Sequence, residues 1–144
     1  IRDYQPSSGL GDVYKRQESN VVVCYKQRKK ANVIDHMELI GEVKGKNVVI
    51  VDDMVDTAGT LTKAADLMIE RGAKSVRAIC THALLSGNAY EIIENSKLKE
   101  LIVTDSIPQK KESKKVNVLT CANLFADVMH NVNTNQSINP FFIK

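Results

Sequence analysis

Tryptophan is absent from the sequence, and aromatic residues of all kinds are few. Aromatic side chains make up 5% of the 144 residues, whereas hydrophobic residues make up 43% and charged residues 26%. This balance excludes an intrinsically disordered chain and is typical of a globular protein. A membrane-spanning helix needs about 20 consecutive apolar residues, and no run in this sequence approaches that length. The sequence therefore predicts a soluble protein of about one domain with no membrane partner.

Cysteine and histidine are also scarce. Cys24, Cys80 and Cys121 lie far apart, and an odd, dispersed set of cysteines is typical neither of a disulfide framework nor of a metal site. Reduced thiols of this kind indicate a cytoplasmic protein. The three histidines show no spacing typical of metal ligands and are predicted to be structural: His36, His82 and His130. No metal ligand can be named from the sequence.

A strong charge of one sign is missing too. The net charge is +3 and the isoelectric point is about 8.7. Nucleic-acid-binding proteins usually carry a larger and more localised basic excess, so no nucleic-acid partner is predicted and small anionic ligands fit better. Four clustered lysines are predicted to form a solvated loop face: Lys110, Lys111, Lys114 and Lys115.

The first seventeen residues differ from the rest of the chain. They contain Pro6, Gly9 and Gly11, show no hydrophobic period, and lack the apolar stretch of a secretory signal. The string SSGLGDVYKRQ resembles read-through of a sequencing adapter. We therefore predict that residues 1–17 are a non-native or disordered segment and that the domain comprises residues 18–144.

Beyond this segment, short apolar runs alternate with helical patterns. Extended segments are predicted at 20–25, 37–43, 47–53, 75–83, 101–105 and 117–121. Helices are predicted at 60–71, 88–95 and 122–131. The polar residues 27–32 are expected to form a basic loop. The alternation predicts an α/β fold with a parallel sheet covered by helices on both faces, in which residues 48–51 form a central, buried strand.

One helix has a clear apolar stripe. Leu61, Ala64, Ala65 and Met68 are spaced as neighbours on one face of a helix, and Gly72 stands where a glycine would end it. We expect this face to pack on the sheet.

The segment between the 47–53 strand and this helix combines acids with an anion-binding turn. Ligands of an open α/β sheet bind at the carboxyl ends of its strands, where Asp52 and Asp53 can accept hydrogen bonds from sugar hydroxyls. Thr57 and Thr60 offer hydroxyl groups, Gly59 allows close backbone approach, and the helix amino terminus attracts anions. Together these groups describe a ribose 5-phosphate site. A capped strand-to-helix corner without a ligand is the plainer interpretation of the same pattern.

The whole string VVIVDDMVDTAGT, residues Val48 to Thr60, closely resembles the phosphoribosyl-binding signature of the type I phosphoribosyltransferase fold. From about Val21 to Lys144 the chain resembles the C-terminal part of the ribose-phosphate pyrophosphokinases. Further segments match that family in order and spacing: Lys26–Asn32, Gly41–Leu61, Glu70–Val76, Thr81–Ala89 and Val103–Pro108. The resemblance implies a Rossmann-like, phosphoribosyltransferase-like domain.

The family transfers the diphosphoryl group of MgATP to the C1 hydroxyl of ribose 5-phosphate, giving phosphoribosyl pyrophosphate and AMP. By resemblance, Lys26 and Arg28 are the catalytic cations; without it, they would belong to an ordinary basic surface loop. The residues implied to bind ribose 5-phosphate are Asp52, Asp53, Asp56, Thr57, Ala58, Gly59 and Thr60. Ser137 and Phe142 match regulatory positions between subunits, although the family's serine two residues after Ser137 is here Asn139.

The resemblance also implies partners. ATP is the co-substrate, Mg²⁺ is bound by residues of a missing N-terminal half, and the enzyme is a homo-oligomer, a hexamer in the family. The chain is then a fragment that is inactive alone. Two alternatives stay open. A nucleobase phosphoribosyltransferase would have a hydrophobic base-binding hood and no paired Lys26 and Arg28, and a non-catalytic regulatory homologue would have lost these cations or the acidic pair.

Overall fold

The structure is a computed structural model that describes residues 21–30 and 33–142. The side chains of residues 25–36 lie outside this description, as does the predicted segment 1–17. The chain divides into two compact units, of which Val22–Cys121 holds the sheet and the other holds the segment that begins at Ala122. Each unit is described by itself.

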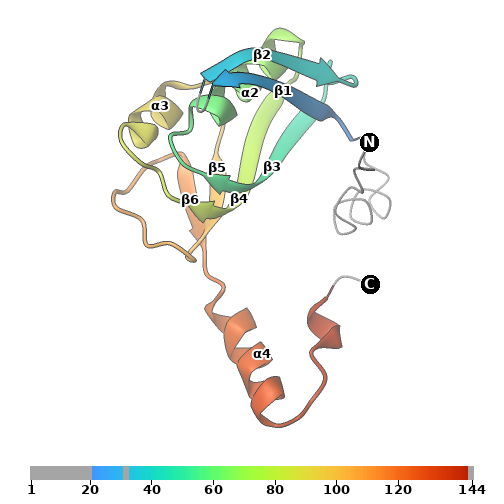
Figure 1. Cartoon of the computed structure of the whole chain (residues 1–144), viewed down its shortest axis with the longest axis vertical. Coiled ribbons are helices and arrows are strands. Elements are labelled where there is room, and N and C mark those ends of the chain that lie inside the picture. Colours follow the sequence, from blue (N-terminus) through green and yellow to red (C-terminus); the bar gives the residue numbers. More distant parts are fainter. Residues whose placement is uncertain (1–20, 31–32, 143–144) are drawn as a thin grey trace. The chain divides into compact units, whose positions relative to one another are not determined.

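The sheet unit combines an antiparallel ribbon with a parallel sheet (Figure 1). Its elements are β1 Val23–Lys30, β2 Val33–Ile40, β3 Asn47–Val55, α2 Gly59–Glu70, β4 Ser75–Ala83, α3 Ala89–Asn95, β5 Leu101–Thr104 and β6 Val116–Leu119. β1 pairs antiparallel with β2, and the parallel sheet has the order β3-β4-β5-β6. The predicted α/β class with a parallel sheet is confirmed, and β4 has the bounds that its β-branched run predicts.

The start of the unit differs from the prediction. Residues 27–30, expected in a polar loop, continue β1, and Gln27, Arg28 and Lys30 pair with residues of β2. Val21 and Val23, expected in a buried strand, are 54% and 53% exposed. Strand pairing satisfies backbone hydrogen bonds whatever the side chains are, so a polar and basic segment can form a strand when a partner strand lies beside it.

Helix α2 is confirmed as an amphipathic helix. Leu61, Ala64, Ala65 and Met68 are at most 4% exposed. The helix ends in a Schellman motif: Gly72 has φ +88°, its N–H donates to the Ile69 carbonyl at 2.9 Å, and the Ala73 N–H donates to the Met68 carbonyl at 3.0 Å. The left-handed conformation explains why glycine stands at position 72.

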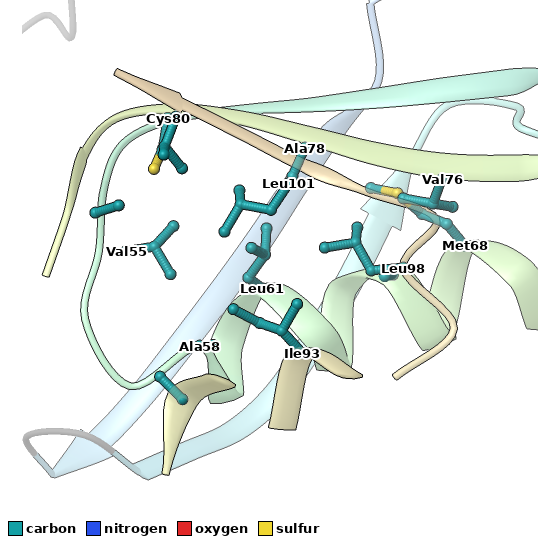
Figure 2. Close-up of a cluster of buried hydrophobic side chains, with 14 of the residues drawn as sticks. Val55, Ala58, Leu61, Met68, Val76, Ala78, Cys80, Ile93, Leu98 and Leu101 are labelled. Carbon is teal, nitrogen blue, oxygen red and sulfur yellow. The ribbon is translucent and has the colours of Figure 1, made fainter. Parts of the chain in front are cut away.

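The core lies between the sheet and helices α2 and α3. Figure 2 shows Leu61 and Met68 of α2 and Ile93 of α3 directed toward the side chains of the parallel strands. The strand residues in this cluster are almost completely buried: Val76, Ala78, Cys80, Leu101 and Val103. Val55, the last residue of β3, belongs to the same buried cluster, so the carboxyl end of that strand is packed against this layer.

The opposite face of the sheet is apolar but exposed. Val49 and Val51 of β3 are 51% and 57% exposed, and Ile79 of β4 is 42% exposed. Within the described residues β3 is also the edge strand. The prediction of a central, buried strand at 48–51 is therefore wrong for this chain, and the described part of the sheet unit carries no helix over this second face. Alternating burial along β3 follows directly from one-sided packing.

The second unit contains α4, Ala122–Asn133, and a short 3₁₀ helix, Asn139–Phe141. Helix α4 begins at the predicted residue and runs two residues longer than predicted. None of its residues is buried. In the described part of the chain, no helix has both the length and the apolar character needed to cross a membrane.

Candidate functional site

The two acids lie in the last part of β3, and the strand continues beyond them to Val55. Asp53 is exposed and Asp52 is half-buried. The Asp53 N–H donates to Asp52 Oδ1 at 3.1 Å, and the Met54 N–H donates to Asp53 Oδ1 at 2.8 Å. Each carboxylate therefore bonds the next backbone amide. Because one such bond uses only part of a carboxylate's acceptor capacity, both can still accept hydrogen bonds from hydroxyl groups.

The turn between β3 and α2 leads directly into a helix amino terminus. Asp56 and Thr57 are exposed, whereas Ala58 is buried and adopts a left-handed conformation with φ +62°. Helix α2 then begins at Gly59, and its first turn contains no acidic residue. The first N–H groups of a helix have no carbonyl partner within that helix, and its positive dipole end favours anions. This corner is therefore suited to an anionic group.

Gly59 leaves open space at that amino terminus. A Cβ built on Gly59 would meet no heavy atom within 4 Å, and its φ lies outside the left-handed region. Neither the backbone conformation nor packing within the described chain thus requires glycine here. By contrast, the left-handed residue of the turn is Ala58. The described chain therefore leaves open space beside the backbone at the amino terminus of α2.

Lys26 and Arg28 lie on β1, opposite Met37 and Ile34 of β2. Their backbones are described and their side chains are not. A register shift lies between Gln27 and Arg28. The expectation that residues two apart point to one face assumes regular alternation, which such an irregularity interrupts. The role of the two cations stays a prediction.

Sequence reasoning missed the segment that supports the turn. The loop after β4 donates backbone hydrogen bonds to the carbonyls of Val55 and Asp56. Its sequence, THALLSGNA, served only to identify the resemblance, and no sequence pattern indicates which carbonyls a loop will bind.

Polar side chains also connect the carboxyl ends of β4 and β5. Thr104 Oγ1 and Ser106 Oγ donate to the Thr81 carbonyl at 2.7 and 2.8 Å. His82 Nδ1 lies 3.0 Å from Ser106 Oγ.

In the loop before β6, Lys115 Nζ donates to the Ser96 carbonyl at 2.7 Å. That lysine therefore ties the loop to the end of α3, so the expected solvated face does not include it.

Cys80 lies beside Asp52 in the register of β3 and β4 and is 1% exposed. Burial, and next the negative charge of Asp52, raise the pKa of the Cys80 thiol from 9.0 to about 11. Only the thiolate is an effective nucleophile. Cys80 is therefore a packing residue rather than a reactive one.

We expect iodoacetamide at pH 8 to label half-buried Cys121 in the folded protein and to leave Cys80 unmodified, as peptide mass spectrometry would show. Denatured protein is the control in which both thiols react. The pKa of the Cys80 thiol in the folded protein lies above its ordinary value. The protonated Cys80 thiol therefore favours folding below pH 9, and this contribution to stability is lost as the pH rises toward about 11. Equal labelling of Cys80 and Cys121 in folded protein would contradict this prediction.

The predicted regulatory residues lie in the second unit. Ser137 Oγ accepts a hydrogen bond from the Asn139 N–H at 3.2 Å, and its carbonyl accepts one from Asn131 Nδ2 at 2.9 Å. Phe142 is 62% exposed. Their regulatory role stays a prediction. Among the described residues, no group of three or more His, Cys, Asp or Glu side chains is arranged to hold a metal ion.

The fold and the β3–α2 corner define an α/β protein in which a turn suited to an anionic group follows the carboxyl end of a parallel strand. The chain belongs to the family described as the phosphoribosyl synthetase-associated domain, whose sequence model matches residues 12–143. The match includes residues 12–17, part of the segment predicted to be foreign to the domain.

Relatives and a solved structure agree with this membership. The chain is 50% identical over 124 residues to a ribose-phosphate pyrophosphokinase of Wolinella succinogenes, covering 86% of this chain and 40% of the relative. It is 49% identical over 131 residues to that of Campylobacter jejuni, covering 91% and 42%. The crystal structure of phosphoribosylpyrophosphate synthetase from Mycobacterium smegmatis matches with a TM-score of 0.67 at 36% identity, covering 69% of this chain and 34% of the other. The chain thus spans about two fifths of the length of these curated relatives.

Proposed function

We propose that this chain acts as part of a ribose-phosphate diphosphokinase. That enzyme would transfer the β,γ-diphosphoryl group of ATP to the C1 hydroxyl of ribose 5-phosphate, giving phosphoribosyl pyrophosphate and AMP. The observation that carries the proposal is the β3–α2 corner, where two acids precede a helix amino terminus with open space at Gly59. The names of the relatives at 49% and 50% identity support the same activity.

Different groups of the corner would bind the phosphate and the sugar of ribose 5-phosphate. The N–H groups of the first turn of α2 and the hydroxyls of Thr57 and Thr60 would bind the 5-phosphate, because they donate to an anion. The carboxylates of Asp52 and Asp53 would accept hydrogen bonds from the ribose hydroxyls. Asp56 and Ala58 shape the turn between these two groups of ligands.

The diphosphoryl transfer needs positive charge that this corner does not supply. Lys26 and Arg28 would stabilise charge on the transferred group, as positioned cations do in phosphoryl transfer. Mg²⁺ bound to ATP would neutralise the phosphate charge. We propose that its protein ligands belong to a part of the enzyme that this chain does not include, and that the enzyme is a cytoplasmic homo-oligomer, a hexamer.

A nucleobase phosphoribosyltransferase would use the same sugar-phosphate corner. The presence of both Lys26 and Arg28 and the names of the relatives favour the diphosphokinase. A regulatory homologue is less consistent with a sequence that keeps the cations and the acidic pair together.

The proposal is tested by measuring AMP and phosphoribosyl pyrophosphate formation from ATP and ribose 5-phosphate. A full-length protein that contains this chain should form both in equal amounts, whereas the chain alone should form neither. Asp52→Ala should raise the KM for ribose 5-phosphate about tenfold, since it removes a charged hydrogen-bond acceptor. The control Asp66→Ala removes a half-buried carboxylate two turns along α2 and should leave this KM unchanged. A full-length protein without synthesis would contradict the proposed function.

A further inference from the structure

The turn that leads into α2 is supported from one side by the loop after β4. The N–H groups of Leu84 and Leu85 donate to the Val55 carbonyl at 3.0 and 3.3 Å. The Ser86 N–H donates to the Asp56 carbonyl at 3.0 Å. We call residues 84–86 the supporting segment. Three consecutive amides thus bond the two residues at which the chain leaves β3 for the turn.

Leu85 is the anchor of the supporting segment. Its side chain is 2% exposed and is among the largest fully buried side chains of the chain. Its backbone has φ +44°, a left-handed conformation that is uncommon for residues other than glycine. Such a conformation persists only where surrounding contacts over-determine it. Here the buried side chain and the hydrogen bonds to β3 provide those contacts.

Further bonds hold the supporting segment at both ends. The Ser86 carbonyl accepts the Ala89 N–H at 3.2 Å, where α3 begins. At the other end, Gln109 Nε2 donates to the Ala83 carbonyl at 3.3 Å, and Tyr90 Oη donates to Gln109 Oε1 at 3.0 Å. The supporting segment is therefore bonded to α3 and, through Ala83, to the loop after β5. It can thus act as a rigid support for the turn between β3 and α2.

We propose that Leu85 is a positioning residue for ribose 5-phosphate. Its buried side chain fixes the supporting segment, whose amides hold the Val55 and Asp56 carbonyls and so set the direction in which the chain reaches the amino terminus of α2. The proposal rests on the proposed function of that corner. Binding by a helix amino terminus requires its N–H groups to be placed in advance. A less rigid supporting segment therefore weakens ribose 5-phosphate binding and leaves ATP binding nearly unchanged.

The test compares two equal truncations in the full-length protein that contains this chain. Leu85→Ala and Leu98→Ala each remove a leucine side chain that is at most 2% exposed, but only residue 85 lies in the supporting segment. Both variants should lower the melting temperature. Only Leu85→Ala should raise the KM for ribose 5-phosphate, by about tenfold, with the KM for ATP within about twofold of wild type. Leu85→Met, which nearly conserves side-chain volume, should keep the wild-type KM for ribose 5-phosphate.

A second variant acts mainly through the backbone. Ser86→Pro removes the N–H that bonds the Asp56 carbonyl, so it should also raise the KM for ribose 5-phosphate. This variant tests the proposal even if Leu85→Ala does not fold. Calorimetric binding of ribose 5-phosphate, measured on every variant, separates this proposal from the proposed function. A protein that binds ribose 5-phosphate more weakly after Leu85→Ala or Ser86→Pro supports the positioning role even if it makes no phosphoribosyl pyrophosphate. Unchanged affinity in both variants, an equal loss in Leu98→Ala, or a wild-type protein that does not bind ribose 5-phosphate would overturn it.

Discussion

Replacement of Lys26 or Arg28 by alanine in the full-length protein is expected to reduce kcat by about a hundred- to a thousand-fold. Charge develops on the transferred phosphoryl oxygens mainly in the transition state, so the loss belongs to the chemical step more than to substrate binding. Removal of one such charge-assisted contact costs about 3–4 kcal/mol of transition-state stabilisation, which corresponds to that factor. Steady-state kinetics with ATP and ribose 5-phosphate would measure it.

The double variant tests whether the two cations act together. Because Lys26 and Arg28 are proposed to stabilise the same group, their combined loss should be smaller than the product of the single effects. Lys74→Ala is the control, since this exposed lysine precedes the amino end of β4 and thus belongs to the opposite end of the strands from the corner. Near-normal turnover of Lys26→Ala and Arg28→Ala would show that both are ordinary residues of a polar strand.

Gly59→Ala is expected to preserve the fold and to lower ribose 5-phosphate affinity on the order of a hundred-fold. The added Cβ meets no heavy atom of the chain within 4 Å, and the φ of residue 59 suits any L residue. Alanine also has a higher helix propensity than glycine, so the free energy of unfolding should stay the same or rise slightly. The affinity for ribose 5-phosphate should fall, because the added Cβ would occupy the space through which the phosphate is proposed to approach the backbone. Thermal melts and calorimetry would measure the two effects.

Gly45→Ala is the matched control for this variant. A Cβ at residue 45 also meets nothing within 4 Å, but its φ is +72°. Alanine is strained in this conformation, so Gly45→Ala should destabilise the protein by about 1 kcal/mol. Gly45 lies in the turn before β3, away from the corner, so ribose 5-phosphate affinity should not change. Wild-type affinity in Gly59→Ala would contradict the assignment of the open space to the phosphate.

Local patterns predicted the elements whose structure depends on local spacing. Helix α2 follows from Leu61, Ala64, Ala65 and Met68, because the period of a helix brings these positions to one face. Strand β4 follows from a β-branched apolar run that is bounded by polar and small residues. The position of Gly72 predicted the end of α2, since its left-handed conformation suits glycine.

Predictions that depended on neighbours in space were less successful. The basic residues 27–30 belong to β1 because β2 pairs with them, which no property of their own composition indicates. Residues 48–51 of β3 were predicted to form a central strand because all four are apolar. In the described structure β3 nevertheless forms an edge, with Val49 and Val51 exposed. An apolar run shows that a strand can be buried on both faces, but not that a second layer is present.

The candidate site combines both kinds of information. The sequence alone determined which polar groups the corner carries, because the acids, threonines and glycine lie within residues 52–60 and their order along a strand and helix places them together. Only the tertiary structure decided what holds that corner in place. The supporting segment lies about thirty residues away in the sequence, and its backbone amides bond the Val55 and Asp56 carbonyls. Backbone hydrogen bonds are available to every residue type, so their partners are set by how the chain packs, with buried Leu85 as the anchor.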